Sequence, residues 1–343
     1  MKPDERDRTA VDDPGGRTSR RIRWVLFGLT GLLSAAIVVI AFDPAPHTGG
    51  DNAGYIALAY SLLTDGSYTE IFDPAGLPHT KYPPVFPALL AGLMLLGARS
   101  WAALKTVAAI ATVATSLLTY LWAERRLGSV WAFGVALAAS GASAVVYYSH
   151  WILSDPTFVA LTMLSLWALD RSDEGELRRR WLVIGVVGAG LAYFTRSAGI
   201  PLLVAIGAWL LVRRRWRALA AAAVGVGVPA ILWLMRARGA GQGDYGSEFW
   251  LVDPYDPALG RIGGLGLVDR IVGNLIGYVG THVPAGIVGT QGVAVVLLGV
   301  AVVGLGVAGW LLAARRAVGP TELFLPLYTG LILVWPEVWS GDR

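Results

Sequence analysis

The stretch WVLFGLTGLLSAAIVVIAF, residues 24–42, decides the fold of this chain. Its 19 residues carry no charge, and a helix of that length, rising 1.5 Å per residue, crosses a hydrocarbon core of about 30 Å. Residues 1–23 are arginine-rich and predict a disordered, basic cytoplasmic tail. A cleavable signal peptide is the alternative, but the apolar run is longer than a typical signal core and no convincing cleavage site follows Phe42. The pattern favours an uncleaved membrane anchor.

The composition of the whole chain predicts a multi-span membrane protein. Of its 343 residues 55% are apolar, and the mean hydropathy of +0.57 is too high for a soluble domain. Cysteine is absent and the four histidines lack ligand spacing, so a divalent metal site is not expected. The pI near 9.4 does not indicate nucleic-acid binding, because the basic residues cluster beside apolar segments. The lipid bilayer is therefore the expected partner, and no nucleic acid is.

Eight further apolar segments bring the predicted number of transmembrane helices to nine. Arginine clusters lie between alternate segments, and a cytoplasmic N-terminus places most of the 28 Lys and Arg residues on the cytoplasmic side. The preference for arginine over lysine suggests a bacterial protein, so the expected location is the plasma (inner) membrane. After residues 24–42 the predicted spans are 101–122, 130–148, 156–169, 181–194, 198–212, 218–235, 287–314 and 323–339.

Two shorter apolar segments lie between the first and second spans. If residues 83–97 were a span, every later loop would be inverted, so we predict an interfacial or re-entrant helix there. Residues 53–64 predict a second surface-lying helix, with Asp51 or Asn52 as its N-cap. The sequence thus predicts an all-α integral membrane protein with about nine transmembrane helices and two interfacial helices in the first extracytoplasmic loop.

This topology divides the chain into the tail, residues 1–23, and one transmembrane domain, residues 24–343. Two long loops are predicted outside the cytoplasm, residues 43–100 and residues 237–286. The later loop is rich in glycine, aspartate and aromatic residues, which suit recognition of an acceptor sugar or peptide, although most such loops are simply solvated.

The first outer loop carries a carboxylate and an ammonium group suited to a lipid phosphate. Asp51 follows two glycines, which let the backbone turn away from the first span. Its carboxylate is either a general base toward an acceptor hydroxyl or a helix N-cap. Lys81 is the only lysine of that loop and either binds a phosphate oxygen or anchors the loop to headgroups. Pro83 and Pro84 fix an extended backbone that would hold Lys81 in place.

Three more polar groups are predicted on the same side of the membrane. His79 lies in the first outer loop. Asp155 begins a span and is either its N-cap or a second carboxylate facing Asp51. Arg196 lies in a turn between two short spans, which implies a water-filled recess, unless the arginine merely snorkels to the surface. Convergence of acids and bases from separate loops is typical of an active site.

Five motifs along the chain carry a family resemblance. They are Asp51-x-x-x-Tyr55, Lys81-Tyr82-Pro83-Pro84, Arg125-Arg126-Leu127-Gly128, Ser154-Asp155-Pro156 and Thr195-Arg196. In their order and in their placement on alternating sides, they resemble the GT-C polytopic glycosyltransferases. The similarity covers nearly the whole chain and is greatest to the family 39-like branch with the protein O-mannosyltransferases and the lipid A aminoarabinose transferase.

The resemblance implies transfer of a hexosyl or pentosyl group from a polyprenyl-phosphate-linked donor to an acceptor hydroxyl on the extracytoplasmic face, with inversion. Asp51 would be the catalytic base, Lys81 and Arg196 would hold the carrier phosphate, and Asp155 would support the acceptor side. The donor is the only cofactor-like molecule implied, and the acceptor is a glycan, a lipid or a protein. The other expected substrate-binding residues are Tyr55, His79, Tyr82 and Arg343.

The chain departs from the family pattern at two places. The protein mannosyltransferases carry an acidic residue after the first aspartate, whereas this chain has Asn52, so a protein acceptor is less favoured. An arginine like Arg343 is typically followed by an apolar run, so we expect the sequence to be a fragment of a longer protein.

Two other functions are compatible with an apolar scaffold of this kind. A flippase or transporter of a polyprenyl-linked sugar also needs cations for a phosphate, but it should place ionisable residues near the membrane midplane and use both faces. The candidate residues here lie toward one end of their spans, which favours the transferase. A non-catalytic membrane subunit would require neither Asp51 nor Lys81.

Overall fold

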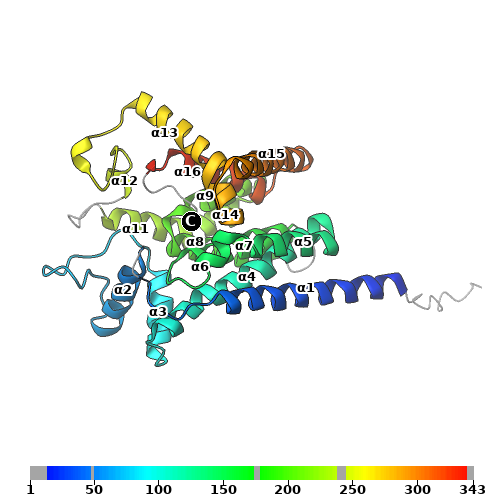
Figure 1. The fold of residues 1–343 in the computed structure, drawn as a ribbon, viewed down its shortest axis with the longest axis horizontal. Helices are drawn as coiled ribbons and strands as arrows, with labels where there is room; N and C mark the ends of the chain where they lie inside the picture. Colours follow the sequence, from blue (N-terminus) through cyan, green and yellow to red (C-terminus); the bar gives the residue numbers. More distant parts are fainter. Residues whose placement is uncertain (1–13, 48–49, 174–177, 238–244, 338–343) are drawn as a thin grey trace, which may run out of the picture.

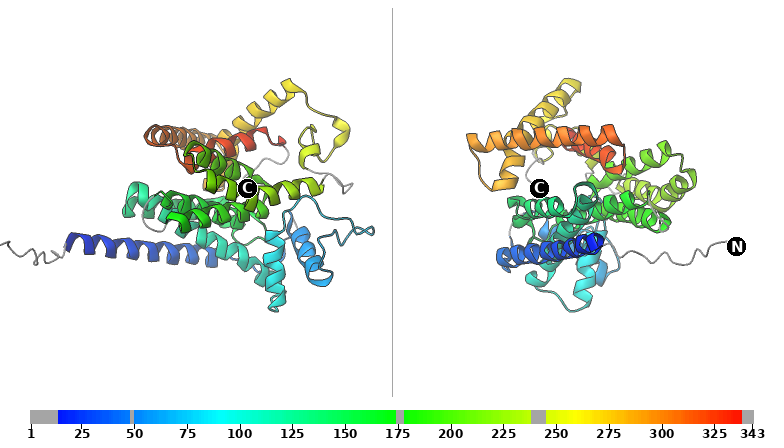
Figure 2. Two further views of the ribbon diagram at one scale, coloured as in Figure 1. Left: turned by 180° about the vertical axis from the view of Figure 1, so that it is seen from behind. Right: turned by 90° about the vertical axis from the view of Figure 1, so that its right-hand side faces the viewer.

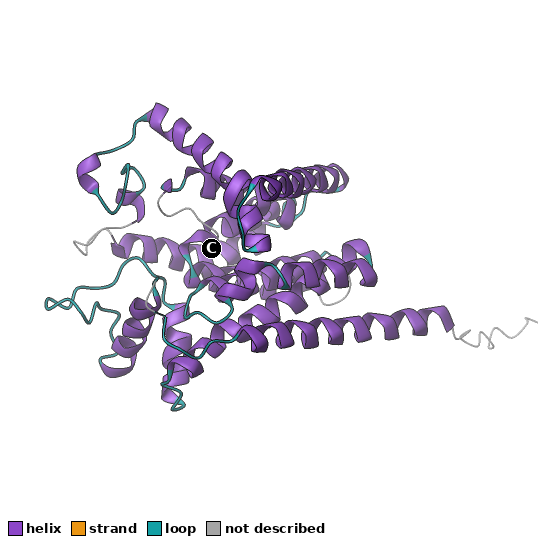
Figure 3. Cartoon of the chain, viewed as in Figure 1, coloured by secondary structure: helices purple, strands orange, loops and turns teal. Residues whose placement is uncertain are grey.

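The computed structural model describes the chain as a helical protein over residues 14–47, 50–173, 178–237 and 245–337. No strand is drawn in these ranges (Figure 3), which confirms the all-α prediction. The helices are α1 (Pro14–Ala41), α2 (Asn52–Thr64), α3 (Val85–Leu95), α4 (Trp101–Leu127), α5 (Ser129–Ser140), α6 (Ser143–Tyr148), α7 (Asp155–Arg171), α8 (Arg178–Thr195), η1 (Ser197–Gly199), α9 (Ile200–Val212), α10 (Trp216–Ala222), η2 (Ala223–Gly227), α11 (Val228–Ala237), α12 (Tyr245–Glu248), η3 (Pro257–Leu259), α13 (Gly264–Gly277), η4 (Tyr278–His282), α14 (Val283–Val288), α15 (Val293–Arg316) and α16 (Pro320–Val334).

Five helical segments of the described chain are long and apolar enough to cross a membrane. Four of them fall on predicted spans, whereas other predicted spans are shorter helices, such as α5 with 12 residues and α9 with 13. Helix length therefore supports a multi-span protein without establishing the count of nine. The five segments are Arg20–Ala41, Trp101–Leu127, Trp216–Arg236, Gly264–Val288 and Val293–Arg316.

The span predicted at residues 130–148 is interrupted in the structure, because α5 and α6 are separate helices. The backbone becomes extended at Ala142, with φ −61° and ψ 132°. Ser140 and Gly141, which precede this break, have weak helix propensity. The Ser140 hydroxyl is also bound to the Ser116 hydroxyl of α4, 2.6 Å away, so this turn is fixed against its neighbour.

The outer loop predicted at residues 237–286 is helical in its second half. Arg270 and Asn274, two polar residues of this stretch, are buried. Arg270 Nη1 donates to the Phe249 carbonyl at 2.7 Å, and Asn274 Nδ2 donates to the Trp335 carbonyl at 2.8 Å. Buried polar groups with such partners are compatible with an apolar helix, which sequence periodicity alone does not reveal.

The helices α1, α4, α5 and α7 form a bundle, and α3 runs across the direction of α1 near the end of α1 (Figures 1 and 2). At that end α1 finishes and α4 and α7 begin. Lys105 of α4 is fully buried and donates to the Asp43 carbonyl at 2.6 Å, which joins the end of α1 to α4. We call this the Asp51 end of the bundle.

The opposite end of the bundle, the Arg126 end, carries ion pairs between neighbouring helices. They lie outside the apolar parts of these helices, where charged groups stay hydrated. The pairs place predicted arginine clusters together at one end, which is the pattern expected of a cytoplasmic face. They are Arg23–Glu124 at 3.3 Å, Arg126–Asp170, and Arg215–Asp173 at 2.6 Å.

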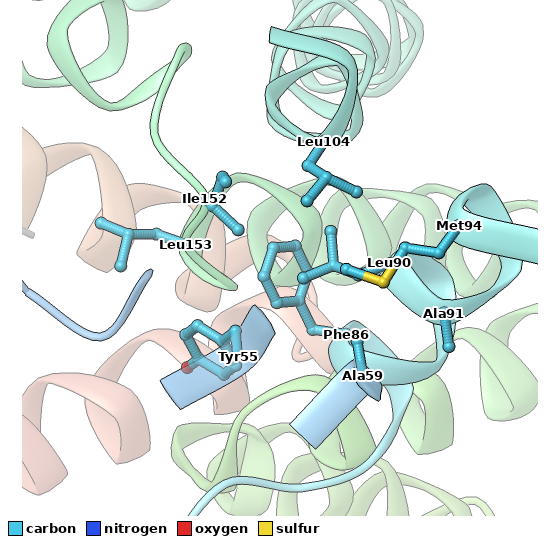
Figure 4. Close-up of a cluster of buried hydrophobic side chains, with 9 residues drawn as sticks. All are labelled: Tyr55, Ala59, Phe86, Leu90, Ala91, Met94, Leu104, Ile152 and Leu153. Atoms are coloured by element: carbon cyan, nitrogen blue, oxygen red, sulfur yellow. The ribbon is translucent and has the colours of Figure 1, made fainter. Parts of the chain in front are cut away.

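The first loop is docked on the bundle by a buried apolar cluster (Figure 4). The rings of Tyr55 on α2 and Phe86 on α3 meet edge to face, with centroids 4.9 Å apart. Leu104 of α4 and Ile152, before α7, close the cluster from the bundle side. In Figure 4 the Tyr55 hydroxyl points away from Phe86. Because the Tyr55 ring is buried in this cluster, the direction of its hydroxyl group is fixed.

The junction of α8 and α9, where Arg196 lies, depends on a close backbone approach at Gly199. A Cβ added there would lie 2.7 Å from the Tyr193 Cα and 2.9 Å from the Tyr193 nitrogen. Backbone atoms cannot move aside as the end of a flexible side chain can. The steric clash in Gly199→Ala should therefore destabilise the protein by roughly 1–3 kcal/mol. Gly207→Ala on α9, with nothing within 4 Å of the added Cβ, is the control. Equal thermal unfolding temperatures for the two variants would contradict this packing.

Candidate functional site

Asp51 occupies the turn between α1 and α2 and presents its carboxylate to the first loop. The preceding Gly50 has φ +70°, a conformation that glycine adopts without strain. Asp51 stands at the N-cap position of α2, but its side chain makes no cap hydrogen bond. Its Oδ1 accepts from the Tyr82 hydroxyl at 2.9 Å. Asp51 is therefore the predicted N-cap residue of α2 by position, while its Oδ1 binds the Tyr82 hydroxyl.

Asn52 and Tyr55 of α2 bind the turn between α6 and α7. Asn52 Oδ1 accepts from the Ile152 backbone N–H at 3.0 Å, and the Tyr55 hydroxyl lies 2.8 Å from the Ser154 hydroxyl. The Asn52 side chain is buried. The residue after Asp51 thus serves to fix the first loop against the segment that leads to Asp155.

Arg196 and Asp155 form an ion pair at the same end of the bundle. Arg196 Nη1 lies 2.6 Å from Asp155 Oδ2, with the two side chains 33% and 16% exposed. Asp155 is the first residue of α7, whose N-cap is Ser154, so Asp155 does not cap the helix. The pair joins the start of α7 to the α8–α9 junction and leaves part of the guanidinium accessible.

Tyr55 lies within the electrostatic field of both carboxylates and of the guanidinium. Burial raises the pKa of Tyr55 well above its usual range, the Arg196 charge lowers it, and Asp155 and Asp51 raise it further. Contacts join the same residues: the Tyr55 hydroxyl lies 2.8 Å from that of Ser154, next to Asp155, and the Tyr55 ring lies 4.8 Å from the ring of Tyr82, which donates to Asp51. The structure therefore brings together four residues that the sequence predicted separately.

Lys81 is held by a residue from the later loop. Its Nζ lies 2.7 Å from Glu248 Oε1 on α12. Tyr245 begins α12. Burial raises the pKa of Tyr245 to about 12, and the charges of Arg196 and Asp51 also influence it. Helix α12 therefore supplies Glu248, which pairs with Lys81, and Tyr245, whose pKa is influenced by Arg196 and Asp51.

His79 is placed between protein groups. Its Nδ1 pairs with Glu70, and its Nε2 accepts from the Tyr82 backbone N–H at 2.7 Å. Arg236 of α11 donates to the carbonyls of His79 and Tyr68, the latter at 3.2 Å. Both ring nitrogens are occupied, so we propose that His79 positions Lys81 and Tyr82 and does not itself bind substrate.

Protonation of His79 should loosen this arrangement. Burial lowers the pKa of His79, although Glu70 raises it in part. Because the pKa of His79 is lower in the folded protein than in the unfolded chain, neutral His79 contributes its full stabilisation above the unfolded-state pKa of about 6.5. This stabilisation is lost as the pH falls through the folded-state pKa of His79. His79→Gln should therefore reduce the fall in unfolding temperature between about pH 7.5 and about pH 5.5 relative to wild type. Parallel curves for the two proteins would contradict this role.

Three residues around the predicted site escaped sequence analysis: Glu70, Arg236 and Glu248. Arg236 ends a long apolar helix, and a charge at such a position is a signal for function. Glu70 and Glu248 carry no local signal, because their partners are set by tertiary structure. Arg343 lies outside the described residues. Among those described, no three His, Asp or Glu side chains are grouped as metal ligands.

Residues 81–235 match the family model of the dolichyl-phosphate-mannose-protein mannosyltransferases. The matched range includes Lys81, Tyr82, Asp155 and Arg196 and leaves out Asp51. No curated protein matches the chain.

Two crystal structures of ArnT from Cupriavidus metallidurans are similar in fold. The apo structure has a TM-score of 0.50 and 17% identity, over 91% of this chain and 76% of that one. The structure bound to undecaprenyl phosphate has a TM-score of 0.57 and 19% identity, over 93% of this chain and 56% of that one. Together, the family match and the shared fold confirm the resemblance of this multi-pass membrane protein to the GT-C polytopic glycosyltransferases.

Proposed function

We propose that the protein transfers a sugar from a polyprenyl-phosphate-linked donor to an acceptor hydroxyl, with inversion, at the Asp51 end of the bundle. Polyprenyl-phosphate-dependent glycosyl transfer is the activity that the family match and the fold support. The roles of individual residues rest on one observation: contacts of Tyr55 link Asp51, through Tyr82, to the Asp155–Arg196 ion pair, through Ser154, and Lys81 precedes Tyr82 in the sequence.

Asp51 is the proposed general base. The acceptor oxygen attacks the anomeric carbon while its proton passes to the Asp51 carboxylate, and the bond from that carbon to the phosphate oxygen breaks with the electron pair on the phosphate. One displacement of this kind inverts the anomeric carbon. The Tyr82 hydroxyl fixes the orientation of the base through its 2.9 Å hydrogen bond.

Lys81 and Arg196 are the proposed ligands of the carrier phosphate. Negative charge grows on this phosphate as the sugar leaves, and fixed cations stabilise the transition state more than the ground state. The 33% exposure of the Arg196 side chain leaves it able to meet a ligand while Asp155 holds its other side. No step in this mechanism requires a metal ion.

The Asp51 end is proposed to face away from the cytoplasm of a bacterial inner membrane. The arginine clusters at the Arg126 end support this orientation. Buried Asn52 accepts from the Ile152 backbone N–H, so the departure from the acidic residue of the protein mannosyltransferases is proposed to serve packing of the first loop.

The activity is tested with membranes that contain the protein and a pool of undecaprenyl phosphate carrying a radiolabelled sugar. An envelope extract supplies acceptors. We expect label to move to an acceptor and free undecaprenyl phosphate to appear in equal amount, relative to membranes without the protein. Movement of intact labelled lipid across the bilayer with no release of undecaprenyl phosphate would identify a transporter.

A further inference from the structure

Lys81 is engaged by a carboxylate in this structure, although it is the cation proposed for the carrier phosphate. The 2.7 Å contact with Glu248 Oε1 occupies the position where a phosphate oxygen would bind the ammonium group. Lys81 is 35% exposed and Glu248 is 14% exposed, so the pair closes over the lysine from one side. A phosphate and a carboxylate at the same ammonium repel each other, so the two anions should compete.

Glu248 belongs to a folded unit, residues 245–263, which we call the 245–263 segment. The Val252 N–H donates to the Gly260 carbonyl at 2.9 Å, and the Ile262 N–H donates to the Trp250 carbonyl at 2.8 Å, so the segment turns back on itself. Arg270 of α13 donates to the Leu251 carbonyl at 2.5 Å and to a second carbonyl beside it. The segment is therefore tethered to α13, which presents Glu248 to Lys81 in a defined position.

Lys81 is the main partner that holds the Glu248 carboxylate in place. Its second carboxylate oxygen, Oε2, is buried and has no hydrogen-bond donor among the described residues. A structural carboxylate would normally satisfy both oxygens. An ion pair that is partly exposed on the lysine side is weak enough to exchange for another anion.

We propose that Glu248 is a displaceable counter-ion of Lys81, which yields the ammonium group to the phosphate of a lipid-linked donor and reclaims it when the phosphate leaves. This inference rests on the proposed function, because it takes the carrier phosphate as the incoming anion. In the donor this phosphate is a diester with one negative charge, the same charge as a carboxylate, so it competes with Glu248 on equal terms. When the sugar leaves, the phosphate becomes a monoester with more charge, and Glu248 regains Lys81 only after this product has dissociated.

The test measures binding of radiolabelled undecaprenyl phosphate to the purified full chain in lipid nanodiscs. Glu248→Gln removes the competing charge with little change of shape, so it should bind about two- to fivefold more tightly than wild type. In a Lys81→Ala background the same substitution should give no gain. Asp269→Asn on α13 removes an equal charge from an exposed position and should bind like wild type.

Inorganic phosphate separates recognition of the phosphate group from recognition of the lipid chain. With the labelled lipid kept well below its dissociation constant, inorganic phosphate should displace it at a lower concentration from Glu248→Gln than from wild type. Equal displacement curves would show that the lipid chain, and not the anion, controls binding, and would overturn the proposal.

Unchanged or weaker lipid binding by Glu248→Gln would also overturn it, because a residue that merely positions Lys81 gives that result. A gain of the same size in Asp269→Asn would reduce the effect to net charge. These outcomes are distinct from failure of the proposed function. If undecaprenyl phosphate binds as expected but no sugar is transferred, the transferase proposal fails while the counter-ion role stands.

Discussion

Asp51→Asn should lower sugar transfer by at least about a hundredfold, because a general base commonly contributes 10²- to 10⁴-fold and an amide does not accept the acceptor's proton. The amide oxygen of asparagine still accepts from the Tyr82 hydroxyl, which lies 2.9 Å from the native carboxylate. The first loop should therefore keep its shape. The measurement is release of undecaprenyl phosphate from the labelled donor, together with the thermal unfolding temperature of the purified variant.

Asp65→Asn, at the exposed C-terminal end of the same helix α2, is the matched control. It makes the same chemical change away from Tyr82 and should transfer sugar at the wild-type rate. Retained turnover in Asp51→Asn would remove the base from the mechanism, whereas an equal loss in Asp65→Asn would point to the charge of the loop as a whole.

Arg196→Gln should have two separable effects. Loss of a fixed cation at the leaving phosphate should reduce transfer by about 10²- to 10³-fold, the range found for single groups that stabilise transition-state charge. It also leaves Asp155, which is 16% exposed, without the partner 2.6 Å away. Since the arginine is partly exposed, we expect a modest destabilisation of about 1 kcal/mol.

The double variant Arg196→Gln/Asp155→Asn distinguishes these effects. It removes both charges, so the unfolding temperature should recover while transfer stays low. Arg99→Gln, at an exposed position before α4, controls for loss of a positive charge at this end of the protein. Recovery of transfer in the double variant would mean that Arg196 serves only to neutralise Asp155.

The residues whose chemistry is local were predictable from sequence. Asp51 follows a glycine turn and Lys81 precedes two prolines, so both stood out before their partners were known. Asp155 and Arg196 were each placed near the end of an apolar segment, and the structure joins them in one ion pair. Patterning of charge and hydropathy was sufficient for these positions, because a bilayer restricts where ionisable groups can lie.

The remaining features depend on contacts between distant segments. The loop at residues 237–286 was predicted from its glycine, aspartate and aromatic residues, yet Arg270 and Asn274 within it are buried against backbone carbonyls, and the helix there was missed. The pairing of Glu248 with Lys81 likewise has no local signal. Hydropathy reports the average environment of a segment and does not identify the partner that neutralises a polar group within it.

The hydrogen bonds between the first loop and the segment before α7 also affect when the site forms during synthesis of the chain. The Tyr55–Ser154 bond spans 99 residues, the Asn52–Ile152 bond spans 100, and the Arg236–Tyr68 bond spans 168. Bonds of such high contact order form late. The first loop thus leaves the ribosome with Asp51 and Tyr82 together, but long before Ser154, Ile152 and Arg236, which dock it, and before Glu248, which pairs with Lys81.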